Sequence, residues 1–335
     1  MNAPFLNTNQ TRRGFTMTEL VVVIGVIAVL AGILLAAMGG VRRKALATTT
    51  ISTMTEFSKA CDAFQLEHGR YPGVVPENVL AAGGPSTTAP PNISGTENAL
   101  LELMGGVRLE TDADYDDFPL PINVGSPLYG LWELHVDQDR IGEGPLINGR
   151  QYAPYFTPSE SMLRAVKGQL PNEENRELPD LIDAWGQPIV YVRRARPSGP
   201  LVGRNVNDSV QPQFYSKSMW PYTTATELGK VGQDQTDSET GSILNTAQFP
   251  EATFAQILRH PSLGSFGTVA EAQAGTAQGA YILFSAGPDG IYFSRADGPG
   301  TAQLAVDDIV NELAPDYSNP AIVKEYDDIR IFGGG

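Results

Sequence analysis

One acidic side chain stands at the border of a long apolar run near the start of the chain. Glu19 follows the segment 12–18 (RRGFTMT), and residues 20–38 carry no charge. A helix rises about 1.5 Å per residue, so this run is long enough to cross the roughly 30 Å of bilayer hydrocarbon. A carboxylate at such a border is costly unless an opposite charge accompanies it. The chemistry that these residues predict is therefore ion pairing.

The same segment resembles the recognition sequence of type IV prepilins and type II secretion pseudopilins. It has a short basic leader, then Gly14 and Phe15, then Glu19 at the fifth position counted from Phe15. The resemblance implies that a prepilin peptidase cuts between Gly14 and Phe15 and methylates the new amino group. It also implies that Glu19 of one subunit meets the Phe15 amine of a neighbour, which would set the stagger of a filament. Removing one partner of a buried ion pair typically costs about 3–5 kcal/mol.

Three other interpretations compete with this one. A secretory signal peptide has an apolar core of about 7–15 residues and a small-residue cut site, which residues 37–39 (AMG) could supply. The run here is longer, and Glu19 is at the wrong end. A plain membrane anchor explains the length but not the Gly-Phe-x-x-x-Glu pattern, and a buried core helix is favoured less than either of these. Basic residues flank both ends of the run, so the positive-inside rule does not set the orientation; the resemblance places the leader in the cytoplasm.

Composition excludes several functions. The chain has 335 residues and a formal charge of −15, and its first 44 residues hold five of the 23 basic groups but one of the 38 acids. The remainder is thus strongly acidic, which argues against a nucleic-acid partner. The single cysteine, Cys61, allows no intrachain disulfide and is expected to be a small buried side chain. His68, His135 and His260 are scattered and no nucleophile or phosphate-binding motif is present, so we expect no enzyme.

Helical character is predicted to continue beyond the apolar run. Few helix breakers occur in residues 41–68, and an apolar stripe recurs there at roughly helical intervals. Gly69 is the expected stop. The following turn, in the stretch 67–73 (EHGRYPG), resembles the one through which major pseudopilins leave their long helix. The expected stripe consists of Ile51, Met54, Cys61 and Phe64, with Phe57 and Ala60 beside it.

The rest of the chain predicts a small sheet with long loops. Residues 180–192 (DLIDAWGQPIVYV) read as a turn followed by a strand. They resemble the Asp-x-Trp-Gly-x-Pro-x-x-Tyr segment of major pseudopilins, in which Trp185 would anchor the sheet against the helix. Further strands are expected at 280–286, 291–294 and 329–332, and short helices at 98–107 and 159–167. Residues 108–176 otherwise look irregular, and insertions are expected near 81–98 and 193–250.

A metal site is suggested by the C-terminal acids. The segment 285–290 (SAGPDG) resembles the start of the pseudopilin calcium loop, which ends in Asp-Ile; carboxylates and carbonyls are the ligands that Ca²⁺ prefers. The resemblance implies Asp289, Asp327 and Asp328 as ligands, with Asp307 and Asp308 as alternates. The competing interpretation is that these are solvated turn carboxylates.

Together these features predict an α+β, pilin-like fold in which one long N-terminal helix packs on a small antiparallel sheet. The expected divisions are a cleaved leader (1–14), a transmembrane and filament-core helix (15–40), its amphipathic continuation (41–69) and a globular periplasmic head (70–335). The resemblance implies a single-pass inner-membrane protein that polymerises with like or related subunits, extracted by an assembly ATPase and a platform protein. A secretion pseudopilus and an extracellular adhesion, motility or DNA-uptake fibre remain open, for a major or a minor subunit. The alternative is a membrane-anchored binding module that does not polymerise.

Overall fold

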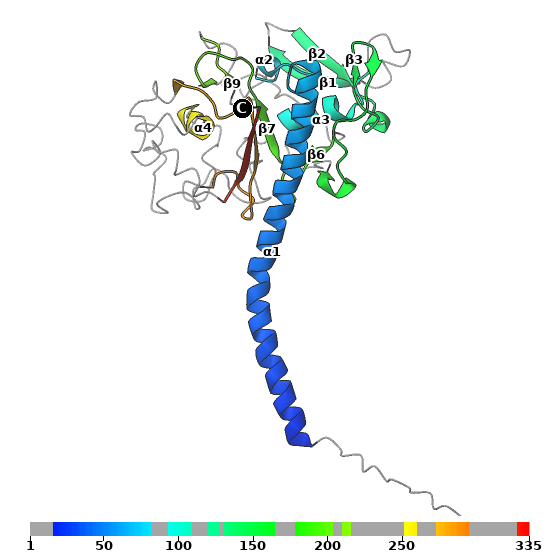
Figure 1. The fold of residues 1–335 in the computed structure, drawn as a ribbon. Coiled ribbons are helices and arrows are strands. Elements are labelled where there is room, and N and C mark those ends of the chain that lie inside the picture. Colours follow the sequence, from blue (N-terminus) through cyan, green and yellow to red (C-terminus); the bar gives the residue numbers. More distant parts are fainter. Residues whose placement is uncertain are drawn as a thin grey trace, which may run out of the picture. The chain divides into compact units, whose positions relative to one another are not determined.

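The computed structural model describes nine stretches of the chain: 16–81, 93–108, 119–126, 130–164, 178–203, 210–215, 251–259, 273–294 and 327–334. Side chains are left undescribed at 33–37, 119–133, 164, 251–253 and 256. The chain divides into two compact units, Met1–Ala45 and Leu46–Gly335. Helix α1 (Met17–His68) belongs to both (Figure 1).

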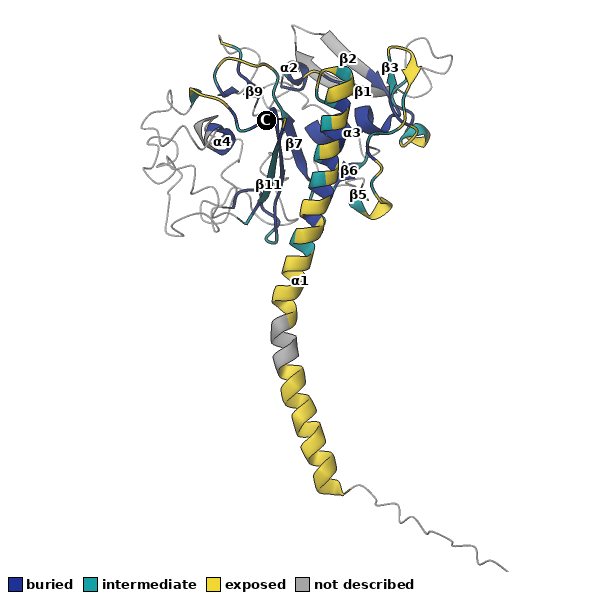
Figure 2. Ribbon diagram, in the orientation of Figure 1, coloured by how far each residue is buried: buried dark blue, intermediate teal, exposed yellow. Residues whose placement is uncertain are grey.

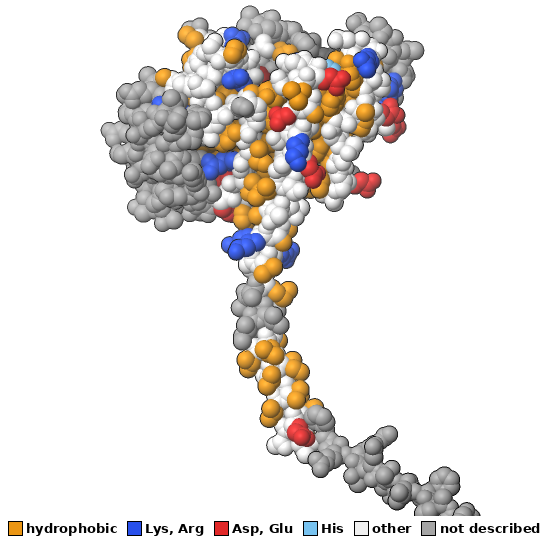
Figure 3. All heavy atoms as spheres, viewed as in Figure 1, with side chains coloured by type: hydrophobic (Ala, Val, Ile, Leu, Met, Phe, Trp, Pro, Cys, Tyr) orange, Lys and Arg blue, Asp and Glu red, His pale blue; other side chains and the backbone are white. Residues whose placement is uncertain are grey.

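In the first unit, helix α1 presents apolar side chains to solvent. Val22, Ile24 and Ile27 are each more than half exposed. Figures 2 and 3 show this exposed, apolar surface along the N-terminal part of the helix. Among the described residues, no helix meets the length and hydropathy needed to cross a membrane.

In the second unit, the remainder of α1 buries one face in the head. Met54, Phe57, Cys61 and Phe64 are fully buried, as the stripe predicted. Ile51 is the exception at 47 % exposed, so its place in the stripe was wrong. The buried positions at that turn are Thr50 and Thr53, and the Thr50 hydroxyl accepts a hydrogen bond from the Ala184 backbone N–H at 3.1 Å. A polar contact with the loop thus replaces the expected apolar one.

Helix α1 ends where the sequence predicts. His68 is its last residue, and Gly69 follows with φ +73°, the left-handed conformation that glycine adopts without steric cost. The Gly69 N–H donates to the Gln65 carbonyl, which satisfies one of the last free carbonyls of the helix. The turn that follows redirects the chain into the head.

The central sheet has three antiparallel strands in the order β11-β10-β7, namely β11 (Ile329–Gly333), β10 (Tyr281–Ser285) and β7 (Val190–Arg193). Tyr281 lies opposite both Gly333 and Arg193. Side chains alternate between its two faces, as the strand period of two requires. On one face, Tyr191, Tyr281 and Leu283 pack with α1 and α3.

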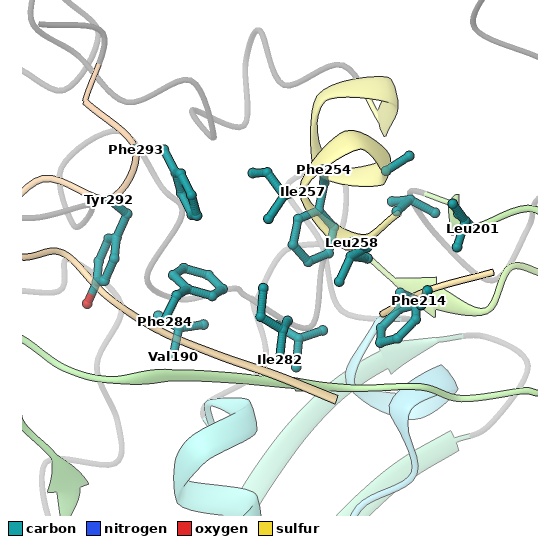
Figure 4. Close-up of a cluster of buried hydrophobic side chains, with 14 of the residues drawn as sticks. Val190, Leu201, Phe214, Phe254, Ile257, Leu258, Ile282, Phe284, Tyr292 and Phe293 are labelled. Atoms are coloured by element: carbon teal, nitrogen blue, oxygen red, sulfur yellow. The ribbon is translucent and has the colours of Figure 1, made fainter. Parts of the chain in front are cut away.

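The opposite face of the sheet forms a second core. Val190, Ile282 and Phe284 pack there against the apolar side of α4 (Glu251–Leu258), as Figure 4 shows. The short parallel strands β8 (Val202–Gly203) and β9 (Phe214–Tyr215) cover the same cluster. The region 193–250 was expected to be a polar insertion, but its strands β8 and β9 are buried in this core. Residues 204–209 and 216–250 of it lie outside the described ranges.

Helix α3 (Gly95–Met104) joins the sheet to α1. Its start is fixed by a capping box, in which the Ser94 hydroxyl accepts from the Glu97 N–H at 3.0 Å and the Glu97 carboxylate accepts from the Ser94 N–H at 2.7 Å. This motif starts the helix three residues before the predicted bound of 98. The Thr96 hydroxyl donates to the Ile189 carbonyl at 2.6 Å and accepts from the Tyr191 N–H at 3.0 Å. Helix and strand are thereby held in one register.

Three further sequence predictions were wrong. Residues 108–176 are not irregular throughout, because they contain a hairpin of β1 (Pro119–Ser126) and β2 (Gly130–His135). The helix expected at 159–167 is, in its described part, a 3-10 turn at Glu160–Met162 and the strand β5 (Leu163–Arg164), which pairs with β6 (Asp180–Leu181). The strand expected at 291–294 is a turn.

The turn at 291–294 has a clear physical reason. Phe293 adopts φ +49°, outside the β region, and its N–H donates to both carboxylate oxygens of Asp328 at 2.9 and 3.0 Å. Its ring is buried in the second core. The remaining small elements are α2 (Glu77–Leu80), a 3-10 turn at Gln138–Arg140, β3 (Leu146–Ile147) and β4 (Arg150–Gln151).

Truncating the buried face of α1 should destabilise the head. Phe57 meets the rings of Phe156 and Tyr191 edge-on, with centroids 5.3 and 5.6 Å away. We expect Phe57→Ala to lower the free energy of unfolding by about 3–5 kcal/mol because it leaves a cavity. Leu66→Ala is the matched control, since Leu66 is 83 % exposed on the same helix. This substitution should change the free energy of unfolding by about 0.5 kcal/mol or less. Denaturant unfolding of the full chain in detergent measures both; equal effects would contradict the packing described.

Candidate processing and assembly site

The predicted cleavage site lies just before the described residues. Gly14 and Phe15 are outside them, and Thr16 is the first residue described. The Glu19 carboxylate accepts from both the Thr16 N–H and the Thr16 hydroxyl, each at 2.8 Å through Oε2. The Glu19 N–H in turn is 3.3 Å from the Thr16 hydroxyl oxygen, which accepts from it. Thr16 and Glu19 thus form a capping box at the start of α1.

This intramolecular role of Glu19 was not among the predictions from the sequence. The signal was available, because Thr-x-x-Glu directly before an apolar run is the pattern of a capping box. The box satisfies N–H groups that a helix start leaves without intrahelical partners. The capping box also fixes the Glu19 side chain, because both hydrogen bonds from Thr16 reach Oε2 of its carboxylate. Among the described residues, none donates a hydrogen bond to Oε1. The carboxylate is therefore held in place by Thr16 through one of its two oxygens.

The helix surface that follows this box is suited to being covered. Soluble monomers seldom expose contiguous apolar patches of more than a few hundred Å². Here the exposed apolar side chains occupy nearly consecutive positions, so they lie on every side of the helix instead of in one stripe. Figure 3 shows one face of this surface. The exposed side chains include Leu20, Val21, Val22, Val23, Ile24, Val26, Ile27, Val29 and Leu30.

Comparison with known proteins finds matches in this N-terminal segment. A model of the prokaryotic N-terminal methylation motif matches residues 9–35. Prepilin peptidase-dependent protein D of Escherichia coli (strain K12) is 43 % identical over 58 residues, which cover 17 % of this chain and 40 % of that protein. No solved structure matches the chain significantly. The chain therefore carries a prepilin-type cleavage and methylation motif, and its long helix packed on small antiparallel sheets is consistent with a pilin-like fold.

The turn after α1 is built on an ionic network that the sequence did not reveal. The Arg193 guanidinium donates to the Glu77 carboxylate at 2.9 Å and to the carbonyls of Tyr71 and Val75 at 2.7 and 2.8 Å. Gly73, at φ +148°, lies against it so closely that an added Cβ would stand 2.6 Å from the guanidinium carbon. Only glycine fits there, because both the backbone conformation and the space exclude a side chain.

A buried aspartate organises the turn before β7. Asp183 Oδ1 accepts from the N–H groups of Trp185 and Gln187, each at 2.9 Å, and Oδ2 accepts from the Ser285 hydroxyl at 2.6 Å. Burial raises the pKa of Asp183, although these hydrogen bonds oppose the rise. Trp185 itself is half-buried and belongs to no hydrophobic cluster of the described residues. The expected anchoring by Trp185 is instead provided by Tyr191 and Tyr281, which pack with Phe57 in one cluster.

The proposed calcium ligands lie near the junction of β10 and β11. Asp289 Oδ1 accepts a hydrogen bond from the Ile291 N–H at 2.9 Å, and the Asp328 carboxylate accepts one from the Phe293 N–H. Burial raises the pKa of Asp328 well above its ordinary value, and the charges of Asp327 and Asp289 add to the rise. The described residues contain no group of three acidic, histidine or cysteine side chains arranged to hold a metal ion. Asp307 and Asp308 lie outside the described residues.

Calcium therefore stays a prediction of the resemblance, and chelation tests it. Calcium bound among Asp289, Asp327 and Asp328 would offset their mutual repulsion, so the full chain in detergent should melt at a higher temperature in calcium than in EDTA. The double variant Asp327→Asn/Asp328→Asn should lose this difference. A melting temperature that chelation leaves unchanged in the parent chain contradicts the calcium assignment.

Proposed function

We propose that the chain is a structural subunit of a pilus-like filament of the type II secretion or type IV pilus class. The N-terminal methylation motif carries this proposal, because it matches the residues where cleavage and the assembly contact were predicted. The apolar surface of α1 supports it, since a bundle of such helices buries what one helix exposes. The pilin-like head, with no catalytic motif in its sequence, fits a structural role better than an enzymatic one.

The proposed pathway begins at the membrane. Prepilin peptidase removes residues 1–14 and methylates the Phe15 amine, which leaves a cation beside the start of α1. An assembly ATPase and a platform protein then move subunits from the inner membrane into the filament. The name of the relative, which describes dependence on prepilin peptidase, supports the first step.

The capping box supplies a physical basis for the assembly contact. Thr16 holds Glu19 Oε2, so the carboxylate loses little further side-chain entropy when a second donor arrives. We propose that the Phe15 amine of a neighbouring subunit is this donor. The pair stabilises little by itself, because burying two charges offsets most of their attraction. The pair instead sets the axial register of neighbouring subunits, since a single stagger brings the Glu19 carboxylate and the Phe15 amine together.

Processing is tested on the mature amino terminus. In cells with active prepilin peptidase, mass spectrometry should find a chain that begins at a methylated Phe15. Gly14→Val should leave the leader attached, because the peptidase would meet a branched side chain at the cut. Gly25→Val is the matched control within the apolar run and should be processed normally. Recovery of the parent chain with residues 1–14 intact would reject the proposal.

Assembly is tested by substituting Glu19. We expect Glu19→Ala to insert in the membrane normally but to lower filament yield about a hundredfold or more, because the neighbouring amine would be buried alone at a cost of about 3–5 kcal/mol. Thr16→Ala is the comparison, since it removes the capping hydroxyl at a cost of about 1 kcal/mol and keeps the Glu19 charge. Its filament yield should fall much less. Membrane fractionation and quantitation of sheared filaments separate insertion from assembly. Normal assembly of Glu19→Ala would favour an anchored binding module that does not polymerise.

A further inference from the structure

A basic pocket lies in the head beside the end of α1. Its volume is about 450 Å³, within the range typical of ligand-binding clefts. Four arginines line it, namely Arg70, Arg193, Arg194 and Arg196, against one acidic residue, Glu77. This excess of positive charge stands out in a chain with 38 acidic and 23 basic residues.

Two of the arginines are committed to the fold. Arg193 is held by Glu77 and by the turn after α1. Arg70 donates to the buried carboxylate of Glu102 at 2.6 Å, and that carboxylate also accepts from the Gly73 N–H at 2.6 Å. These pairs keep the positively charged wall rigid, because each guanidinium is fixed by more than one bond or by a buried partner.

The other two arginines are available to a ligand. Neither Arg194 nor Arg196 forms an ion pair within the described part of the chain. Their backbone is nonetheless fixed, because the Arg194 N–H donates to the Ala280 carbonyl at 2.7 Å and the Ala195 N–H donates to the Gln213 carbonyl at 2.7 Å. The charge of Arg194 reaches the Tyr71 hydroxyl, where it opposes the rise in pKa that burial causes. The pocket thus combines a rigid base with two solvent-accessible guanidinium groups.

The remaining walls indicate the type of ligand. Tyr71, Pro76 and Pro197 supply flat, stiff apolar surface, and Asn78 and Gln65 supply amide groups. A planar guanidinium matches the two oxygens of a carboxylate, and apolar walls suit the methylene groups that carry acidic side chains. Inorganic phosphate would pair with the positive charge of the pocket but has no apolar group to pack against Tyr71, Pro76 and Pro197.

We propose that this pocket binds an acidic peptide segment of a partner protein, whose side-chain carboxylates pair with Arg194 and Arg196. Arg70 and Arg193 stay paired with Glu102 and Glu77, which offset their charge, so the net positive charge of the pocket comes from Arg194 and Arg196. The inference does not depend on polymerisation, because every lining residue belongs to the second unit, Leu46–Gly335, and none to the segment before residue 46.

Binding is measured on the full chain in nonionic detergent, with fluorescein-labelled hexaglutamate as the probe and labelled hexaglutamine as its neutral counterpart. Fluorescence anisotropy should show saturable binding of hexaglutamate that weakens as salt screens the charges. Arg194→Ala/Arg196→Ala should weaken it at least about tenfold, because two charge-assisted contacts are lost. Lys59→Ala/Arg150→Ala is the charge-matched control, since it removes two exposed cations outside the pocket and should bind as the parent does.

The possible results decide the proposal. Loss of hexaglutamate binding in the pocket variant alone, with an unchanged melting temperature, supports it. If the double variant fails to fold, the single variant Arg196→Glu at an exposed position must show the same loss. Equal binding by the pocket and control variants, or no binding by the parent, overturns the proposal. Displacement of the probe by equimolar inorganic phosphate would show a general anion site and overturn the assignment to peptide.

Discussion

The contact between α1 and the tyrosine face of the central sheet is the interaction on which the head depends. Phe57 packs against Tyr191, whose ring centroid is 5.5 Å from that of Tyr281. The Tyr281 hydroxyl in turn hydrogen-bonds Ser58 and Asp62 on α1. The Tyr191 hydroxyl donates to the Pro72 carbonyl, so both tyrosines combine a packed ring with a hydrogen-bonded hydroxyl group. Because β10 is the middle strand, its position relative to α1 fixes both neighbours. The turn after α1, the start of α3 and the junction at Asp328 are all positioned by the packing of α1 on this sheet.

The sheet also explains why the head can carry a second core. Residues of β7 and β10 alternate between the α1 face and the α4 face, so one three-stranded sheet supports two hydrophobic clusters. The second cluster includes Leu201 and Phe214, which come from a region whose overall composition is polar. A few apolar residues at the right distance along the chain are enough to fold such a segment onto the sheet.

Sequence alone predicted the features that depend on local chemistry. The stop at Gly69 follows from backbone conformation, and the strands at 280–286 and 329–332 follow from hydrophobic pattern. The errors arose where distant residues decide local structure. Phe293 turns instead of extending because Asp328 captures its N–H, and no pattern near residue 293 contains that information. Of the candidate site, Glu19 was identified by its position, but its bond to Thr16 was overlooked. The arginine pocket could not be predicted, because its four cations come from two segments more than a hundred residues apart in sequence.

The double hydrogen bond of Thr96 has a consequence for how copies of the chain can associate. Strand β7 lies at an edge of the sheet, where backbone groups that point outward can pair with a strand from another molecule. One hydroxyl occupies both the Ile189 carbonyl and the Tyr191 N–H, so this edge offers no template for strand addition there. A filament subunit of the kind proposed above would gain from this, because a strand added at β7 would compete with ordered association.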